Sequence, residues 1–338
     1  MVRNTIFLPL FLSFFAVLCY ADTKKKGGVA VQQIVPSYYA AFRCVGAACR
    51  HNCCIGWEID IDADTAAFYR TVGGELGRRL QDGIAYTDGE PHFRLDSRRR
   101  CPFLNGDNLC DIIQQLGEER LCGICSDHPR FRNDLPDRVE IGLGLCCEEA
   151  ARLILGWKEP MTLMGSTATD DAILRLRDAV IATLQNRGQT IPQRVDAMLM
   201  QCGAALPPLQ PDEWASVLLT LERLEPAWTV RLEQLRDRFS DTDLVRFDRH
   251  MAERQTEYEQ LLVYAVYRHL ANAADAAGIA ARAAVAALFY TLIRALGAVQ
   301  WAQTGTFTLA DQVELVREFS AEIEYSDENW YVLLKMLT

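Results

Sequence analysis

Apolar residues recur at helical spacing through most of the second half of the chain. After Asp170 and Asp171, which suit the start of a helix, one apolar face continues up to Gly188. This face consists of Ile173, Leu174, Leu176, Val180, Ile181 and Leu184. Further helices are expected near residues 212–224, 227–239, 251–272, 279–296, 309–319 and 328–337. Thr308 and Asp311 form a capping-box-like start for one of them.

Shorter and more broken patterns fill the first half. Helices are expected over residues 65–81, 109–116 and 148–155, the second stopped by Gly117. The stretch Trp57–Asp62 alternates large apolar and acidic residues, as a half-buried strand does. We therefore expect a mainly α protein. A Cys-rich, metal-binding domain with short helices and one or two strands, residues 29–157, is followed by an α-helical bundle, residues 158–338.

The first 28 residues allow two interpretations. Arg3, the apolar run from Ile6 to Cys19 and the segment ending at Ala21 resemble a signal peptide. Alternatively, the true start lies near Val29, where folded-looking sequence begins, and this is the interpretation we favour. Export would favour disulfides, whereas the cytoplasm would favour metal-bound thiolates.

Charge and hydropathy argue against nucleic-acid binding and against a membrane span. The chain has 338 residues and a net charge of −10, which argues against general nucleic-acid binding because such binding needs a basic face. The alanine-rich stretch 271–298 contains Asp275, Arg282 and Arg294, and the N-terminal apolar run is short and interrupted by Pro9. No nucleic-acid partner and no stable membrane span are therefore expected.

Cysteines carry the most specific signal. Ten of the twelve lie between residues 44 and 147, which marks either a disulfide framework or thiolate ligation of a metal. The vicinal pairs Cys53–Cys54 and Cys146–Cys147 could bridge internally only with strain. In the C-x-x-C motif Cys122–Cys125, a short loop lets two thiolates converge on one ion or cluster. We expect zinc or an iron–sulfur cluster, with disulfides or inert buried thiols as the alternatives.

Histidines could complete a ligand set. His51, His92 and His128 lie in the Cys-rich region, and a ring nitrogen of each could bind zinc. A surface or core histidine is the simpler interpretation for each of them. His250 and His269 lie on or beside predicted helices and are interpreted as packing or solvent residues.

Five blocks of sequence carry a family resemblance. They are Val35–Cys44, Cys49–Trp57, Cys101–Leu104 with Leu109–Ile112, Leu121–Arg130 and Gly144–Arg152. In this order they resemble the flagellin lysine-N-methylase family, which is related to small bacterial proteins with a CxxCxxCC zinc- or iron-chelating motif. The resemblance is close over about residues 29–157 and loose over the helical remainder.

This resemblance implies methyl transfer from S-adenosylmethionine to lysine side chains of flagellin or a similar filament protein, in the cytoplasm. It also implies a Cys-bound centre, either iron–sulfur (4Fe-4S) or zinc. The positions that fit the family's cysteines are Cys44, Cys49, Cys53, Cys54, Cys101, Cys110, Cys122, Cys125 and Cys147. These exceed the four ligands of one cluster, so either two centres exist or several cysteines are structural.

Catalytic and cofactor-binding residues are not assigned by the sequence. The bare GxG of Gly142–Gly144 is a weak match to a Rossmann-type loop. Methyl transfer needs a neutral lysine nitrogen, so the site must either desolvate the amine or place a carboxylate or tyrosinate to accept its proton. Glu58, Asp60, Asp62 or the pair Tyr38–Tyr39 could line such a site. Solvated acids, a helix cap at Asp62 and ordinary aromatics are the simpler interpretations.

Two other classes of function stay open. The cysteines could hold zinc or a cluster in a non-enzymatic module for structure, sensing or metal delivery. Alternatively, the chain could be an exported disulfide-stabilised protein whose helical half binds a partner.

Overall fold

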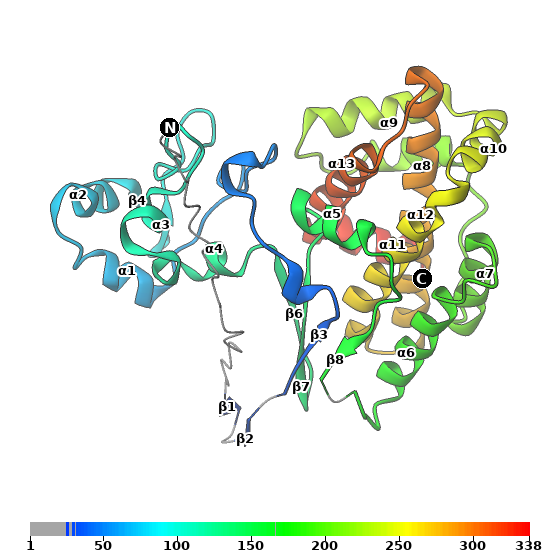
Figure 1. Ribbon diagram of the computed structural model, residues 1–338, viewed down its shortest axis with the longest axis horizontal. Helices are drawn as coiled ribbons and strands as arrows, with labels where there is room; N and C mark the ends of the chain where they lie inside the picture. The colour runs from blue at the N-terminus through cyan, green and yellow to red at the C-terminus, as the bar shows by residue number, and fades with distance from the viewer. Residues whose placement is uncertain (1–24, 27–28, 31, 166) are drawn as a thin grey trace, which may run out of the picture.

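The computed structural model describes residues 25–26, 29–30, 32–165 and 167–338. These residues form a small lobe of short helices and a larger helical body, with a four-stranded sheet between them (Figure 1). The expectation of a mainly helical protein is confirmed. The domain boundary between residues 157 and 158 stays a prediction, and nearly all of the signal-like segment 1–28 lies outside the described residues.

Short elements interrupted by turns build the small lobe. They are α1 (Ala63–Tyr69), α2 (Gly74–Gly83), β4 (Ile84–Thr87), β5 (Glu90–Phe93), α3 (Asp111–Leu116) and α4 (Gly123–Asp127). The single helix expected over residues 65–81 is wrong, because residues 70–73 separate α1 from α2. The second helix begins at Gly74, whose φ of 71° lies in the left-handed region. Gly117, with a φ of 96°, ends α3 as the sequence predicted.

The strand expected over Trp57–Asp62 is also wrong. Ile59 and Ile61 are buried in the core of the small lobe, which explains the alternating pattern. The segment is nevertheless irregular, and it pairs with β5 through an isolated bridge. Asp62 accepts a hydrogen bond from the backbone N–H of Thr65 at 2.9 Å and caps α1, in agreement with the simpler interpretation.

A mixed sheet lies between the lobe and the body. Its strands, in spatial order, are β6 (Arg130–Asp134), β7 (Arg138–Leu143), β3 (Gln32–Pro36) and β8 (Leu163–Met164). Strands β3 and β7 run parallel, and the other neighbours are antiparallel. A separate short pair joins β1 (Lys25–Lys26) and β2 (Val29–Ala30). The fold therefore has more strands than the expected one or two, because it pairs segments that are far apart in the sequence.

The helical body follows the sequence pattern more closely. Its helices are α5 (Glu148–Gly156), α6 (Ala172–Leu184), α7 (Ile191–Gln201), α8 (Pro211–Leu218), α9 (Pro226–Arg238), α10 (Asp241–His250), α11 (Gln255–His269), α12 (Ala276–Thr304), α13 (Leu309–Phe319) and α14 (Asp327–Met336). The capping box of Thr308 and Asp311 is confirmed. Helix α8 ends before Leu224, and α10 was not expected because Phe247 is its one buried residue.

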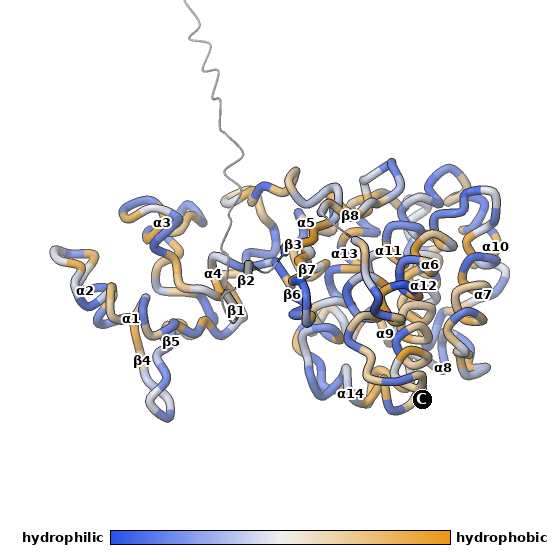
Figure 2. The backbone as a smooth tube through the Cα atoms, turned by 90° about the horizontal axis from the view of Figure 1, so that it is seen from below, coloured by the Kyte–Doolittle hydropathy of each residue, from blue (hydrophilic) through white to orange (hydrophobic). Residues whose placement is uncertain are grey.

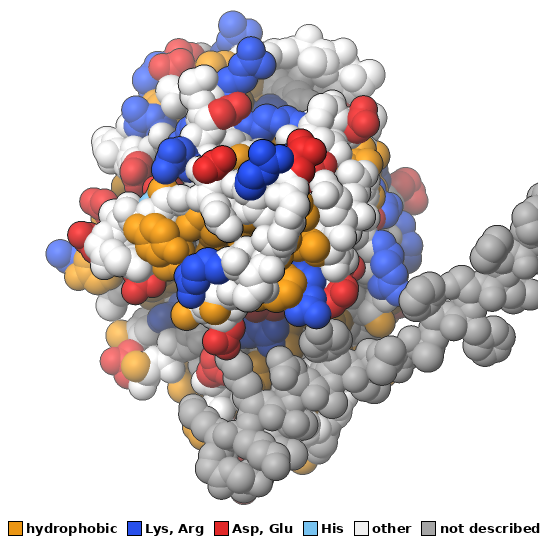
Figure 3. Space-filling model, turned by 90° about the vertical axis from the view of Figure 1, so that its left-hand side faces the viewer, with side chains coloured by type: hydrophobic (Ala, Val, Ile, Leu, Met, Phe, Trp, Pro, Cys, Tyr) orange, Lys and Arg blue, Asp and Glu red, His pale blue; other side chains and the backbone are white. Residues whose placement is uncertain are grey.

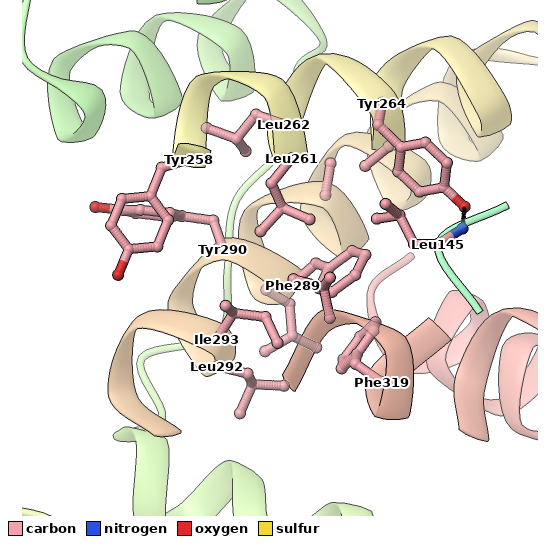
Figure 4. Close-up of a cluster of buried hydrophobic side chains, with 14 of the residues drawn as sticks. Leu145, Tyr258, Leu261, Leu262, Tyr264, Phe289, Tyr290, Leu292, Ile293 and Phe319 are labelled. Atoms are coloured by element: carbon pink, nitrogen blue, oxygen red, sulfur yellow. Dashed lines mark hydrogen bonds between the residues drawn. The ribbon is translucent and has the colours of Figure 1, made fainter. Parts of the chain in front are cut away.

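Helix α12 is the central helix of the body. By length and composition alone it could cross a membrane, but most of its apolar stretch is buried, and it packs against α9, α10, α11 and α13. Figure 2 shows apolar stretches alternating with polar ones along the helices of the body. Phe289 of α12 stacks on Phe319 of α13 with ring centroids 3.9 Å apart (Figure 4). We therefore interpret α12 as a core helix.

The outer face of the small lobe mixes apolar and charged side chains. Figure 3 shows hydrophobic side chains gathered there among Lys, Arg, Asp and Glu. Exposed large apolar residues of this lobe include Ile55, Tyr86, Ile113 and Ile124. Apolar and charged side chains are thus mixed on this face, and the lobe does not present a purely apolar surface.

Candidate functional site

Five of the predicted ligand cysteines share the core of the small lobe, and we call them the inner thiol group. They are Cys54, Cys101, Cys110, Cys122 and Cys125. Cys101 and Cys122 are buried in this core, and the other three pack against it. The backbone N–H of Cys101 donates to the carbonyl of Cys54 at 2.8 Å, which joins two segments distant in the sequence. Cys110 and Cys122 occupy the N-cap positions of α3 and α4.

Burial governs the proton affinity of these thiols. It raises the pKa of Cys101 to about 11, and the nearby Cys110 and Cys122 add to the effect. The hydrogen bond between Cys122 and Cys125 lowers the pKa of Cys122 and raises that of Cys125. A cation bound by such thiols must displace protons, so its affinity will depend on pH.

The other four predicted ligands form an outer thiol group. They are Cys44, Cys49, Cys53 and Cys147. Burial raises the pKa of Cys49, and Glu148, Cys53 and Cys44 add to the rise, so these groups are near neighbours. Their loop is tied to the body where the Nε of Arg50 donates to Glu148 at 2.7 Å and where His51 meets Glu314 at 2.7 Å.

The donor chemistry of both groups suits a thiolate-bound metal, but ligation geometry is not preformed. Among the described residues, no three His, Cys, Asp or Glu side chains converge as metal ligands. The eleven described cysteines are free thiols. The inner thiol group fits iron–sulfur or zinc best because it offers five soft donors around one small core, two of them at helix starts.

The three histidines of the Cys-rich region, which were considered as additional ligands, have other surroundings. His51 pairs with Glu314 of α13, as described above. His92 lies on β5 opposite Ala85 of β4. Burial lowers the pKa of His128 to about 4, and Arg130 adds to this effect. These environments agree with the interpretation of surface or core histidines.

The acidic and aromatic residues considered for a lysine site have the ordinary structural positions that the simpler interpretations expect. Glu58 and Asp60 are exposed, and Asp62 caps a helix. Tyr38 is buried against Trp157, with ring centroids 6.1 Å apart. None of these observations indicates a role in chemistry.

Gly142 and Gly144 serve close packing rather than a nucleotide loop. A Cβ at Gly142 would lie 2.2 Å from the ring of Phe131, and one at Gly144 would lie 2.2 Å from the hydroxyl of Tyr325. Tyr325 also hydrogen-bonds Cys146 and packs edge-on against Trp57, with ring centroids 5.7 Å apart. The chain thus brings the small lobe, the sheet and the end of α13 together at one point.

A polar cleft of about 240 Å³ opens beside this point, and we call it the junction cleft. Its walls come from β6, the end of α11, the π-helical turn Ser320–Glu324 and the start of α14. Glu324 and His269 line it, with Trp330 stacked on the imidazole at a centroid distance of 4.1 Å. Sequence reasoning missed this cleft because His269 and Glu324 are far apart in the chain and match no motif.

A second cleft, of about 530 Å³, lies between α7 and α12. Apolar residues such as Leu199 and Leu206 line most of it, together with Asp196 and Arg294. Arg294 is already engaged with Asp248. This cleft therefore offers shape and apolar surface rather than a set of reactive groups.

Comparison with known proteins adds an independent line of evidence. The model of the FliB lysine N-methylase C-terminal domain matches residues 213–338. The lysine-N-methylases of Salmonella typhimurium and Salmonella choleraesuis are each 33% identical over 138 residues, which are 39% of this chain and 34% of theirs. The match thus spans about a third of those relatives. No solved structure gives a significant match.

The flagellar biosynthetic protein FliU of Salmonella muenchen is matched more completely. It is 32% identical over 134 residues, which are 38% of this chain and 79% of FliU. The predicted family is thereby confirmed, and the chain belongs to the flagellin lysine-N-methylase family.

Proposed function

We propose that this protein methylates lysine side chains of flagellin or a similar filament protein, with S-adenosylmethionine as the methyl donor. The observation that carries the proposal is family membership, above all the match that covers 79% of FliU. The relatives named lysine-N-methylase support the type of reaction. The name of FliU supports the flagellar setting and, with it, a cytoplasmic location.

The chemistry sets one requirement for the site. A lysine side chain has a pKa near 10.4, so almost all of it is protonated at neutral pH, and an ammonium has no lone pair with which to attack a methyl group. The protein must therefore bind the amine and remove a proton at the moment of reaction. A buried base beside a cleft, where the small lobe meets the helical body, would meet this requirement.

A Cys-bound centre is the second part of the proposal. The inner thiol group is the first choice for an iron–sulfur cluster or zinc, and the outer thiol group is the candidate for a second centre or for structural cysteines. When bound, the iron–sulfur cluster or zinc ion would cross-link loops that otherwise share only a small core. The nine predicted ligand cysteines remain candidates until each has been tested.

The enzyme is tested directly with labelled methyl donor. Anaerobically purified protein would be incubated with methyl-labelled S-adenosylmethionine and flagellin, and the flagellin would be digested and analysed by mass spectrometry. We expect label on lysine side chains. No label on lysine, with the metal centre intact, would reject the enzyme in favour of a non-enzymatic metal module.

Two cysteine variants test the metal site. Cys122 and Cys202 are both buried, but Cys122 belongs to the inner thiol group, whereas Cys202 ends α7 in the body. We expect Cys122→Ser to lose bound iron or zinc and Cys202→Ser to keep it. Equal metal content in the two variants would remove Cys122 from the ligand set.

A further inference from the structure

The junction cleft holds a fixed, ionised carboxylate. The Oε2 of Glu324 accepts hydrogen bonds from the hydroxyls of Tyr264 at 2.9 Å and Ser320 at 2.5 Å, and the guanidinium of Arg268 lies 3.5 Å away. Burial opposes ionisation, but Arg268 and the hydrogen bond from His269 outweigh it and hold the pKa of Glu324 at about 2. The side chain of Glu324 is only 1% exposed, so its position is set by these partners.

The carboxylate in turn orients a histidine. The Nε2 of His269 lies 2.5 Å from the Oε1 of Glu324. Because Glu324 is ionised, this nitrogen carries the proton and donates, which leaves Nδ1 with a lone pair. Burial lowers the pKa of His269 against the opposing effect of Glu324, while Arg268 and Arg282 act in the same direction as burial. The imidazole is therefore neutral near pH 7 and competent to accept a proton.

The surroundings of His269 suit the end of a lysine side chain. The ring of Trp330 lines the cleft beside His269 and can attract an ammonium. The ring of Phe131 also lines the cleft, but the guanidinium of Arg268 already lies 5.0 Å from its centroid. Asp327, in the first turn of α14, is exposed at the same cleft and adds a negative charge. The two basic groups there are already paired, Arg268 with Glu324 and Arg132 with Asp127.

The π-helical turn places these groups together. It directly follows α13 and brings Ser320 and Glu324 to one side, with Tyr325 next in the chain. Tyr325 contacts Trp57 and Cys146, as described above. Isolated π-helical turns are frequent at functional sites. The carboxylate–histidine pair therefore lies where the thiol-rich lobe meets the body.

We propose that the junction cleft receives the substrate lysine and that His269, oriented by Glu324, is the general base of the methyl transfer. This inference rests on the function proposed above. It adds a substrate pocket and a catalytic residue. His269 and Glu324 lie within the segment that matches the lysine N-methylase C-terminal domain, whereas the β6 wall of the cleft lies outside it.

Nδ1 of His269 takes one proton from the lysine ammonium and becomes part of an imidazolium, and the neutral Nζ keeps its lone pair. That lone pair forms the new N–C bond to the methyl carbon of S-adenosylmethionine. The S–C bond breaks, and its electron pair stays on sulfur to give neutral S-adenosylhomocysteine. The product is a protonated methyl-lysine, and the imidazolium returns its proton to solvent.

The pH profile of the unaltered protein gives the first test. With a neutral histidine as base, kcat/KM for methylation rises at acidic pH and reaches a plateau well below the pKa of lysine. The charged groups around His269 are Glu324, Arg268 and Arg282, together with Asp327 and Arg132, which line the same cleft. A rate that instead climbs tenfold per pH unit up to about pH 10 would show that the amine loses its proton to solvent, and the proposal would be wrong.

Substitution gives the second test, with a matched control. In His269→Gln, we expect kcat to fall at least about 100-fold and the plateau to disappear. His250→Gln is the control, because His250 is also next to a tryptophan, Trp301, with ring centroids 5.6 Å apart, but its partner is the carbonyl of Phe307. This control should keep the rate and the profile. Circular dichroism and equilibrium binding of S-adenosylmethionine would show that both variants fold and bind the donor.

A third variant keeps the test open if His269→Gln does not fold. Asp327 is exposed, so Asp327→Asn should fold normally, raise KM for flagellin several-fold and leave kcat and the pH profile unchanged. An unchanged KM would argue against the cleft as the lysine pocket. If the unaltered protein labels no lysine, the proposed function fails. If it labels lysine and His269→Gln matches it in rate and profile, only the present inference is wrong.

Discussion

The small lobe and the helical body obtain their stability in different ways. The body has one extensive apolar core in which aromatic pairs such as Phe289 and Phe319 stack between helices. The lobe has a much smaller core, and Cys101 and Cys122 belong to it. Small cores rarely stabilise a fold without a disulfide or a metal. The body therefore combines a large apolar core with buried ion pairs such as Arg194–Glu259, whereas the lobe would gain most from a cross-link.

Metal removal should give the largest difference in stability between the lobe and the body. A structural zinc site contributes on the order of 10 kcal/mol to small metal-dependent folds. After anaerobic chelation, hydrogen exchange should therefore lose its protection over residues 54–127 and keep it over residues 172–337. Equal loss in both regions, or no loss in the lobe of demonstrably metal-free protein, would contradict the comparison.

Truncation of one core aromatic residue in each region should destabilise that region and leave the other unchanged. Phe103 of the lobe lies 4.9 Å from the ring of Phe93, and Phe289 of the body stacks on Phe319. Each substitution by alanine should cost about 3–5 kcal/mol. Phe103→Ala should lower protection in the lobe only, and Phe289→Ala should lower the denaturation midpoint of the body. Hydrogen exchange and urea unfolding would measure the two effects.

Acid should destabilise the fold through His128, which follows α4. Its pKa is about 4 in the folded protein and near 6.5 in an unfolded chain. Between these values the unfolded state binds the additional proton, so stability falls as pH drops from 6.5 to 4 and then levels off. The loss should reach up to about 3 kcal/mol. His128→Gln should flatten this part of the curve of unfolding free energy against pH, whereas an unchanged slope would assign the effect to other groups.

Removal of a helix cap should give the smallest difference in unfolding free energy between the two regions. Asp171 of the body accepts from the backbone N–H groups of Ile173 and Leu174 in a single helix. Asp62 of the lobe caps α1 and also accepts from the backbone N–H of Gly123 in α4 at 2.9 Å. Asp171→Ala should cost about 1 kcal/mol, and Asp62→Ala about 2 kcal/mol. Urea unfolding would compare them, and equal costs would show that the second contact contributes little.

Sequence reasoning succeeded where local signals decide the structure. Apolar periodicity and caps located most of the body helices, including the one that begins after Thr308. It failed where tertiary packing decides. The stretch Trp57–Asp62 buries alternate residues without being a strand, and residues 70–73 divide an expected helix.

The candidate site divides in the same way. The ligand cysteines are visible in the sequence because their spacing is unusual. Their division into inner and outer thiol groups is not visible, because it depends on how the loops pack around the small core. His269 and Glu324 could not be paired, since only the π-helical turn and the end of α11 bring them together.

Metal and acid-labile sulfide analysis of anaerobically purified protein is the decisive test of a Cys-bound metal in the lobe. We expect bound iron with sulfide, or bound zinc, at about one centre or more per chain, and no disulfide bonds between the lobe cysteines. Protein that contains no bound metal and carries these same cysteines as disulfides would contradict it.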